Sequence, residues 1–302
     1  MSEEAVIDVT GLERHFGSQA ALGGINLRVP RGQVFGIVGE NGAGKTTLIK
    51  HILGLYRAQH GTVRVFGMDP VQHPQEVLSR IGYLSEEPDL PPWMRISELM
   101  CYMAAFYPKW DADYAAELMD AFQLNPAKKI KELSKGQRAR AGLVAAQAHR
   151  PDLLLLDEPS SGLDPLVRRD ILGAVIRTVV DEGRTVVFSS HLLSEVERVS
   201  DQVTMISTGK LVLEGPLEDV LSNHRRLVLG GGLQGARPSL PGQLSCEQKG
   251  THWTVVCEGQ ADELGAAARA AQWDLLNDFS VSLDEIFLAR SGVDAESGKK
   301  VA

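Results

Sequence analysis

Residues 34–46, Val-Phe-Gly-Ile-Val-Gly-Glu-Asn-Gly-Ala-Gly-Lys-Thr, decide the fold of this chain. The apolar run 34–38 predicts a buried strand that turns into a helix, from Thr46 to about Leu53. Between them, Gly39 to Thr46 match the spacing G-x-x-x-x-G-K-[ST] of a phosphate loop. Glycines let backbone N–H groups point at a polyphosphate, and the helix N-terminus adds positive potential. We therefore expect a nucleoside triphosphate site here, rather than a glycine-rich turn without a ligand.

Individual roles follow from the chemistry of the loop. The Lys45 ammonium is expected to reach the β- and γ-phosphates, and the Thr46 hydroxyl is expected to hold a magnesium ion. The residues predicted to contact ATP in this loop are Gly39, Asn41, Gly42, Ala43, Gly44, Lys45, Thr46 and Thr47.

The composition excludes several classes of protein. The chain has 302 residues and a formal net charge of −8, so it has no basic excess for binding nucleic acid. No apolar run approaches the ~18–20 residues of a membrane span, and the acidic N-terminus lacks a signal-peptide core. Three scattered cysteines, Cys101, Cys246 and Cys257, suit neither a disulfide framework nor a zinc site. We expect a cytosolic protein with reduced thiols.

Strands and helices alternate along most of the chain, which predicts an α/β fold with a mostly parallel sheet. Ala5–Val9 and Ile25–Val29 alternate apolar and polar residues like antiparallel edge strands. Helical spacing from Ile96 to Gln123 is interrupted by Pro108, which favours two helices over one. Further strands are expected at Gly61–Phe66, Leu153–Leu156 and Thr185–Phe188, with a hairpin at Gln202–Ile206 and Lys210–Leu213.

The composition shifts near the C-terminal end. Gly230 to Gly232 and Pro238 to Gly242 are typical of a loop or linker. The strand-like segment Thr254–Cys257, the alanine-rich segment Ala261–Gln272 and a short helix near Leu283–Leu288 follow. They predict a small appended α+β unit.

A second motif places two carboxylates at the end of an apolar strand. In Leu153–Glu158 the buried strand would deliver Asp157 and Glu158 to the carboxyl edge of the sheet, where open α/β folds bind ligands. We expect Asp157 to hold magnesium and Glu158 to orient or deprotonate the attacking water. The alternative is an acidic helix N-cap after a core strand.

A third motif, Leu133-Ser134-Lys135-Gly136-Gln137, precedes a helical stretch that ends near Ala148. Ser134 is typical of an N-cap, and Gly136 allows the backbone to approach an anion. Alone this is a weak signal, but it lies about twenty residues before the carboxylate strand.

These motifs together resemble the ATP-binding cassette (ABC) ATPases. Their order and spacing match the Walker A, signature, Walker B, D-loop and switch-histidine motifs of that family. The matching segments are Gly39–Thr46, Leu133–Gln137, Leu156–Pro159, Ser161–Asp164 and His191. The resemblance covers roughly Val6 to Leu221. It implies an ATPase domain at 1–221 with a helical subdomain at about 86–150, followed by an accessory domain at 222–302.

The resemblance also implies residue roles. In that family two cassettes pair head to tail, so that Ser134, Gly136 and Gln137 would complete the ATP site of the partner cassette, together with the D-loop Asp164. His191 would bind the γ-phosphate and position water near Glu158. Phe16 matches the aromatic residue that stacks on adenine, although a core phenylalanine is the alternative.

Two positions depart from the family pattern: Lys135 replaces the usual signature glycine, and Glu86 stands where a magnesium-contacting glutamine is usual. A carboxylate can still offer an oxygen to magnesium. With Tyr107–Asp111 and Ser282–Phe287, these departures resemble a branch of bacterial exporters whose permease is a separate chain. In the family the permease inserts a coupling helix near Glu86. Trp93, Met94, Met100 and Met103 suit such a docking surface, or equally a helical core.

The expected function is therefore the ATP-hydrolysing motor subunit of an exporter. It would work as a dimer at the inner membrane face, through a permease, with ATP and Mg²⁺. A soluble ABC protein of translation or DNA repair is the alternative class. The translation proteins carry two cassettes per chain, whereas this chain has one. The DNA-repair proteins insert long coiled coils, and no such heptad pattern lies between Lys45 and Ser134. A regulator that senses ATP is a third possibility.

Overall fold

The computed structural model describes residues 5–180, 183–231 and 237–291. The chain divides into two compact units, Met1–Leu211 and Val212–Ala302. The domain boundary expected after residue 221 falls within the second unit, at helix α8 (Leu217–Ser222). Within the described ranges, no helix combines the length and the apolar character that crossing a bilayer requires.

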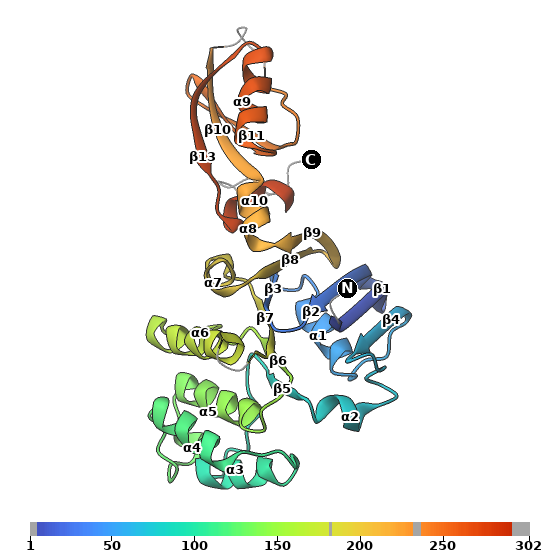
Figure 1. Cartoon of the computed structure of the whole chain (residues 1–302), viewed down its shortest axis with the longest axis vertical. Coiled ribbons are helices and arrows are strands. Elements are labelled where there is room, and N and C mark those ends of the chain that lie inside the picture. Colours follow the sequence, from blue (N-terminus) through green and yellow to red (C-terminus); the bar gives the residue numbers. More distant parts are fainter. Residues whose placement is uncertain (1–4, 181–182, 232–236, 292–302) are drawn as a thin grey trace. The chain divides into compact units, whose positions relative to one another are not determined.

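The first unit is centred on a six-stranded sheet (Figure 1), whose last strand, β9, continues past the boundary at Leu211. Its strand order is β5-β6-β7-β3-β8-β9, and the neighbours from β5 to β8 run parallel. Their carboxyl ends therefore share one edge, and the segments after β5, β6, β7 and β3 follow one another along it. The strands are β3 (Val34–Val38), β5 (Ile81–Leu84), β6 (Leu153–Asp157), β7 (Thr185–Ser190), β8 (Gln202–Ser207) and β9 (Lys210–Pro216).

A smaller antiparallel sheet has the order β2-β1-β4, formed by β1 (Ala5–Phe16), β2 (Gln19–Pro30) and β4 (His60–Val65). The expected antiparallel pairing is confirmed, and β2 lies at an edge of this sheet. The expectation is wrong for β1, which is central, and both strands are more than twice as long as expected. Register shifts near Gly11, which has φ +56°, interrupt the alternation of apolar residues without ending the strand. A glycine tolerates this conformation, so pairing continues to Phe16.

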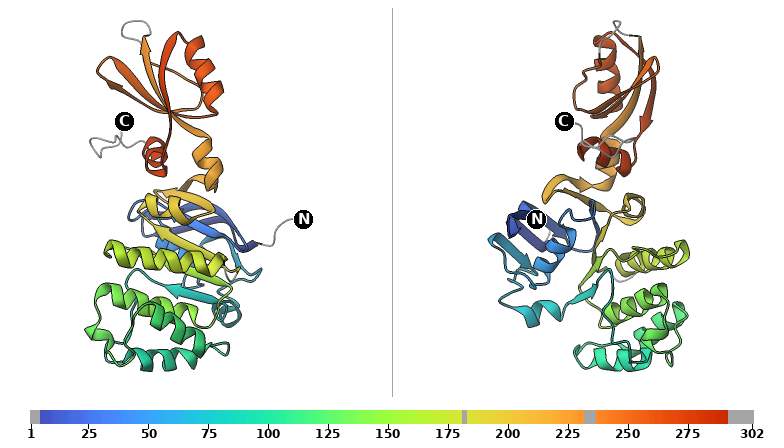
Figure 2. Two further views of the ribbon diagram at one scale, coloured as in Figure 1. Left: turned by 60° about the vertical axis from the view of Figure 1, so that its left-hand side comes forward. Right: turned by 180° about the vertical axis from the view of Figure 1, so that it is seen from behind.

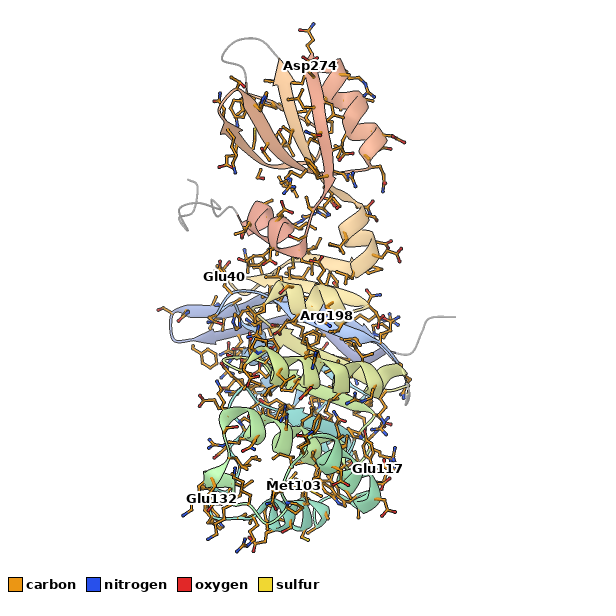
Figure 3. All side chains as sticks on the ribbon, turned by 90° about the vertical axis from the view of Figure 1, so that its left-hand side faces the viewer. Glu40, Met103, Glu117, Glu132, Arg198 and Asp274 are labelled. Carbon is orange, nitrogen blue, oxygen red and sulfur yellow. The ribbon has the colours of Figure 1, made fainter. Side chains whose placement is uncertain are left out.

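Helices cover both faces of the central sheet (Figures 1 and 2). Helix α1 and the antiparallel sheet lie on one side, α6 and α7 on the other, and α3 to α5 gather at one end. Figure 3 shows Met103 and Glu132 at this helical end. The predicted break at Pro108 is confirmed by separate helices α3 and α4. The helices are α1 (Lys45–Ile52), α2 (Pro74–Leu78), α3 (Ile96–Ala104), α4 (Ala112–Ala121), α5 (Lys135–Gln147), α6 (Pro165–Val180) and α7 (Leu193–Val199).

One hydrophobic core joins the two sheets of this unit. Every residue of β3, β6 and β7 is buried, as expected for parallel strands covered on both faces. Ile49 of α1 and Phe35 of β3 pack in the same cluster as Ile7 of β1. Each such side chain contributes ~1.5–3 kcal/mol through burial. This packing fixes where the phosphate loop, between β3 and α1, leaves the sheet.

The second unit is an α+β unit, as predicted, with the antiparallel strand order β11-β12-β10-β13. The predicted strand and two helices are confirmed as β12, α9 and α10, but β10, β11 and β13 were not predicted. Gly230 and Gly231, expected in a loop, end β10, while residues 232–236 lie outside the described residues. The elements are β10 (His224–Gly231), β11 (Gln243–Lys249), β12 (His252–Glu258), α9 (Ala261–Ala270), β13 (Trp273–Ser280) and α10 (Leu283–Ser291).

Candidate nucleotide-binding site

A cavity of about 380 Å³ opens at the carboxyl edge of the central sheet. It combines the end of β1, the phosphate loop and the segments after β5 and β6. Most of its wall is made by residues that the sequence singles out. It is lined by Phe16, Gln19, Ala21, Asn41, Gly42, Gly44, Lys45, Thr46, Thr47, Glu86 and Glu158.

Two glycines of the phosphate loop are required by close backbone contacts. A Cβ atom at Gly39 would lie 2.3 Å from the Ile206 carbonyl oxygen. Gly44 has φ +113°, and a Cβ atom there would lie 2.6 Å from the Ala21 carbonyl oxygen. The loop is therefore held between β2 and β8 before α1 begins at Lys45.

The Lys45 ammonium lies at the centre of the site. Its Nζ donates to the carbonyl oxygens of Gly39 at 2.6 Å and Glu40 at 3.1 Å, and it lies 2.9 Å from Glu158 Oε1. Lys45 and Glu158 are each only 5% exposed. A buried charge needs such partners, and phosphate oxygens can replace them.

Glu158 joins Lys45 to the predicted switch histidine. Its Oε2 accepts from the backbone N–H of His191 at 3.2 Å and lies 2.6 Å from His191 Nδ1. Glu158 has φ +50° and precedes Pro159, a left-handed conformation that costs ~1–3 kcal/mol at a residue other than glycine. The fold thus holds this carboxylate in a strained position between a cation and an imidazole.

Asp157 is placed to act with Thr46. The Ser189 hydroxyl donates to Asp157 Oδ1 at 2.7 Å, and the Thr46 hydroxyl also hydrogen-bonds this carboxylate. Burial raises the pKa of Asp157, and the two hydroxyl donors only partly offset that rise. A buried carboxylate beside a hydroxyl is a hard oxygen pair that suits Mg²⁺. The third predicted metal ligand, Glu86, accepts from the Ser161 hydroxyl at 2.9 Å and also lines the cavity.

A buried carboxylate that the sequence reasoning missed lies next to these groups. Glu195 Oε2 accepts from the Ser160 hydroxyl at 2.5 Å and the Ser190 hydroxyl at 3.2 Å, while Oε1 lies 3.1 Å from Arg168 Nε. It thereby joins the segment after β6 to the last residue of β7. The available signal was its position on α7, because it shares the helix face of Val196 and Val199 and is 5% exposed.

The signature residues lie on another element. Ser134 caps α5 by accepting from the Gln137 N–H at 3.2 Å, while Gln137 Oε1 accepts from the Ser134 N–H. The predicted N-cap is thus confirmed. Gly136 packs on α6, where a Cβ atom would lie 2.8 Å from Val167 Cγ2. None of these three residues is among those lining the cavity.

Two other predicted residues have clear local roles. Asp164 Oδ1 accepts from the N–H groups of Leu166 and Val167, each at 3.1 Å, and so caps α6. Phe16 is 44% exposed, which contradicts a core role. Of the expected docking residues, Trp93 is 69% exposed, whereas Met100 is buried in the core.

Comparison with known proteins bears on this arrangement. The sequence model of the family described as "ABC transporter" matches residues 22–161. The daunorubicin/doxorubicin resistance ATP-binding protein DrrA of Streptomyces peucetius is 32% identical over 96% of this chain and 93% of its own length. The chain belongs to the ABC transporter family. The methionine import ATP-binding protein MetN of Rhizobium johnstonii is also 32% identical, over 100% of this chain and 85% of its own length.

Solved structures agree with this ABC fold. The ATP-binding subunit of an ABC transporter superposes with a TM-score of 0.66 at 28% identity, over 71% of this chain and 91% of that one. The cassette MJ0796, solved as a dimer bound to ADP and Pi, gives a TM-score of 0.63 at 21% identity, over 70% of this chain and 98% of that one. The protein is an ATP-binding subunit of an ABC transporter and an ATP hydrolase.

Proposed function

We propose that this ABC ATPase is the motor subunit of an exporter with a separate permease chain. Two copies pair head to tail, each enclosing ATP between its phosphate loop and the partner's signature helix. The chain works at the cytoplasmic face of the membrane. Hydrolysis then reopens the pair and resets the permease.

The observation that carries this proposal is the separation of the signature from the cavity. Ser134 is exposed at the N-terminus of α5, yet the cavity around Lys45 and Thr46 has no wall from α5. An exposed helix N-terminus, with its cap and positive end, suits an anion brought by another molecule. A second cassette, related by two-fold symmetry, would supply that anion as its bound triphosphate.

Binding of ATP would exchange the partners of Lys45. Phosphate oxygens would replace the Gly39 and Glu40 carbonyls and draw the ammonium away from Glu158. Glu158 would then keep His191 as its neighbour and become free to accept a proton from water. When no triphosphate is bound, the Lys45 ammonium therefore stays paired with the Glu158 carboxylate.

Thr46 and Asp157 would hold Mg²⁺ in this site, with Glu86 as a further oxygen ligand. The ion would supply charge neutralisation at the β- and γ-phosphate oxygens. Ser189 orients both acids, because its hydroxyl donates to Asp157 and accepts from the Glu158 N–H at 2.9 Å. For Glu86 to reach the ion, the hydrogen bond from Ser161 would have to break.

The permease would dock on the helical end, beside Glu86. Trp93 is 69% exposed there, and Tyr102 and Phe106 of the α3 region are 47% and 61% exposed. Exposed aromatic side chains of this kind are typical of protein interfaces. Export is supported by the two departures at Lys135 and Glu86 and by the similarity to DrrA. The similarity to the import protein MetN supports the competing hypothesis, import.

A mixing experiment tests the head-to-tail pair. Lys45→Ala should abolish ATP binding, because the phosphate charge loses its main partner. Ser134→Arg should bind ATP normally but fail to dimerise with it, since a bulky cation replaces the cap. Mixing the two inactive variants should restore one composite site and part of the ATPase activity.

Light scattering with ATP, compared with the exposed-site control Ser79→Arg, gives the dimerisation readout. Normal dimerisation by Ser134→Arg, or no complementation on mixing, would refute the head-to-tail pair.

A further inference from the structure

Phe16 belongs to a cluster with Arg14 and Tyr56 at the end of β1. The Arg14 guanidinium lies 4.7 Å from the centroid of the Phe16 ring and 4.8 Å from that of Tyr56. The two rings meet edge to face, with centroids 5.8 Å apart. One cation therefore contacts two aromatic rings that come from different segments of the chain.

Backbone contacts fix the cluster further. Arg14 donates to the Arg57 carbonyl oxygen at 3.4 Å, next to Tyr56. The Gln59 side chain accepts from the His15 N–H at 2.6 Å and donates to the His15 carbonyl oxygen at 3.3 Å. The segment between α1 and β4 thus clamps the end of β1 on both sides of residue 15.

This clamp matters because Phe16 ends β1 at a hairpin and is 44% exposed. An exposed phenylalanine at a strand end would otherwise sample several rotamers. Base binding would then have to offset the rotamer entropy that is lost when the ring is fixed. The guanidinium lies over one face of the ring, and Phe16 also lines the cavity that contains Lys45. A planar base can therefore stack on the remaining face.

We propose that Arg14 and Tyr56 are positioning residues that preorganise Phe16 as a stacking platform for the nucleobase. The proposal rests on the proposed ATPase function and on the adenine-stacking role that the family resemblance implies for Phe16, and it deepens both. The ligand class is a nucleoside triphosphate with an aromatic base, and the cluster acts on the base alone. The triphosphate would be bound by the phosphate loop, and none of the cluster residues belongs to that loop.

The test separates the two ends of the ligand. Equilibrium binding of Mg-ATP and of Mg-bound inorganic triphosphate is measured for the wild type, Phe16→Ala, Arg14→Gln, Arg14→Lys and Tyr56→Leu. Arg80→Gln is the matched control, because Arg80, just before β5, also lies over a ring, that of Phe66, at 3.8 Å. Thermal unfolding of each variant shows that it is folded.

Arg14→Gln and Tyr56→Leu should weaken ATP binding ~3- to 10-fold, the range of a single cation–π or aromatic contact, and leave triphosphate binding unchanged. Arg14→Lys should recover part of the loss, because the charge stays while the planar group is removed. Phe16→Ala should lose at least as much ATP affinity. Arg80→Gln should change neither ligand's affinity.

Three results would overturn the proposal. If Arg14→Gln and Tyr56→Leu keep the wild-type ratio of ATP to triphosphate affinity while Phe16→Ala lowers it, Phe16 stacks without their help. Equal losses for both ligands would mean that the cluster acts through general charge or folding. An unchanged ratio in Phe16→Ala would remove the base platform itself, while leaving the ATPase assignment of the chain intact.

Discussion

Charged groups are treated very differently in the two units of the chain. In the first, the four charged residues Lys45, Asp157, Glu158 and Glu195 are all at most 5% exposed. Each of them has an ion-pair or hydroxyl partner within the unit. In the second, the pairs Arg225–Asp278 and Arg226–Glu285 keep about a quarter to a third of their side-chain surface in water. Burying a charge is costly, so it persists where chemistry requires it. The buried charges therefore mark the carboxyl edge of the parallel sheet as the catalytic region.

The largest effect expected from this comparison concerns Glu158. Glu158→Gln keeps the shape but cannot accept a proton, so turnover should fall ~10²-fold or more while ATP still binds. Steady-state ATPase rates and ATP titration measure this. The control is Glu285→Gln in the second unit, which breaks the ion pair with Arg226 and should leave turnover unchanged. Near wild-type turnover in Glu158→Gln would break the comparison.

The next largest effect concerns Glu195. Glu195→Ala leaves the Arg168 guanidinium without its carboxylate and two hydroxyls without this acceptor, which should cost ~3–5 kcal/mol of unfolding free energy. Asp278→Ala removes a partly exposed pair and should cost ~0–1 kcal/mol. Urea unfolding, followed separately for the two units, gives both values. Equal costs would show that burial does not distinguish the two sets.

Both units also contain a buried histidine whose protonation should make the stability of that unit depend on pH. His149 donates to the Ile81 carbonyl oxygen and stacks on Tyr107, and burial lowers its pKa to about 4 from 6.5. The unfolded chain therefore binds the proton first. The stability that neutral His149 contributes is fully present above pH 6.5, and it is lost as pH falls towards about 4.

That loss should reach ~3 kcal/mol, at 1.36 kcal/mol per pKa unit, and His149→Gln should flatten the dependence. Chemical denaturation between pH 7 and pH 4.5 checks this. His224 in the second unit also has its pKa lowered, by burial first, so its transition should shift in the same direction. A wild-type first unit with no acid sensitivity in this window would contradict the account of His149.

The smallest effect is expected at Glu86. Glu86→Gln keeps an acceptor for the Ser161 hydroxyl but removes a negative charge near the triphosphate. ATP binding without Mg²⁺ should therefore strengthen several-fold, and the advantage of adding Mg²⁺ should shrink. Titrations with and without the metal, against the neighbouring control Glu87→Gln, measure this. Identical metal dependence in wild type and Glu86→Gln would show that Glu86 does not contact the ion.

The sequence predicts the parts of this molecule that are local in the chain. The phosphate loop, the N-cap at Ser134 and the helix break at Pro108 each follow from a few neighbouring residues. The acids of β6 reach the predicted edge because an apolar strand precedes them. The extent of β1 was missed, since the glycines that allow its bulges also suggest a strand end.

What remained hidden depends on long-range contacts. The position of Glu195 on the apolar face of α7 indicates burial, but only the sheet order shows that Ser160 and Ser190 are its partners. The ion pair between Lys45 and Glu158 joins residues more than a hundred positions apart. Arg14 and Tyr56 come from separate segments, and no short motif marks their contact. Spatial neighbours of this kind need the fold before they can be found.

Gly136 has a mechanical consequence. Because even one added carbon atom would collide with Val167, the start of α5 and the first turn of α6 lie in direct contact. Asp164 anchors that same first turn through the Val167 N–H. We therefore expect the N-terminus of α5, which carries the signature residues, to move together with the first turn of α6.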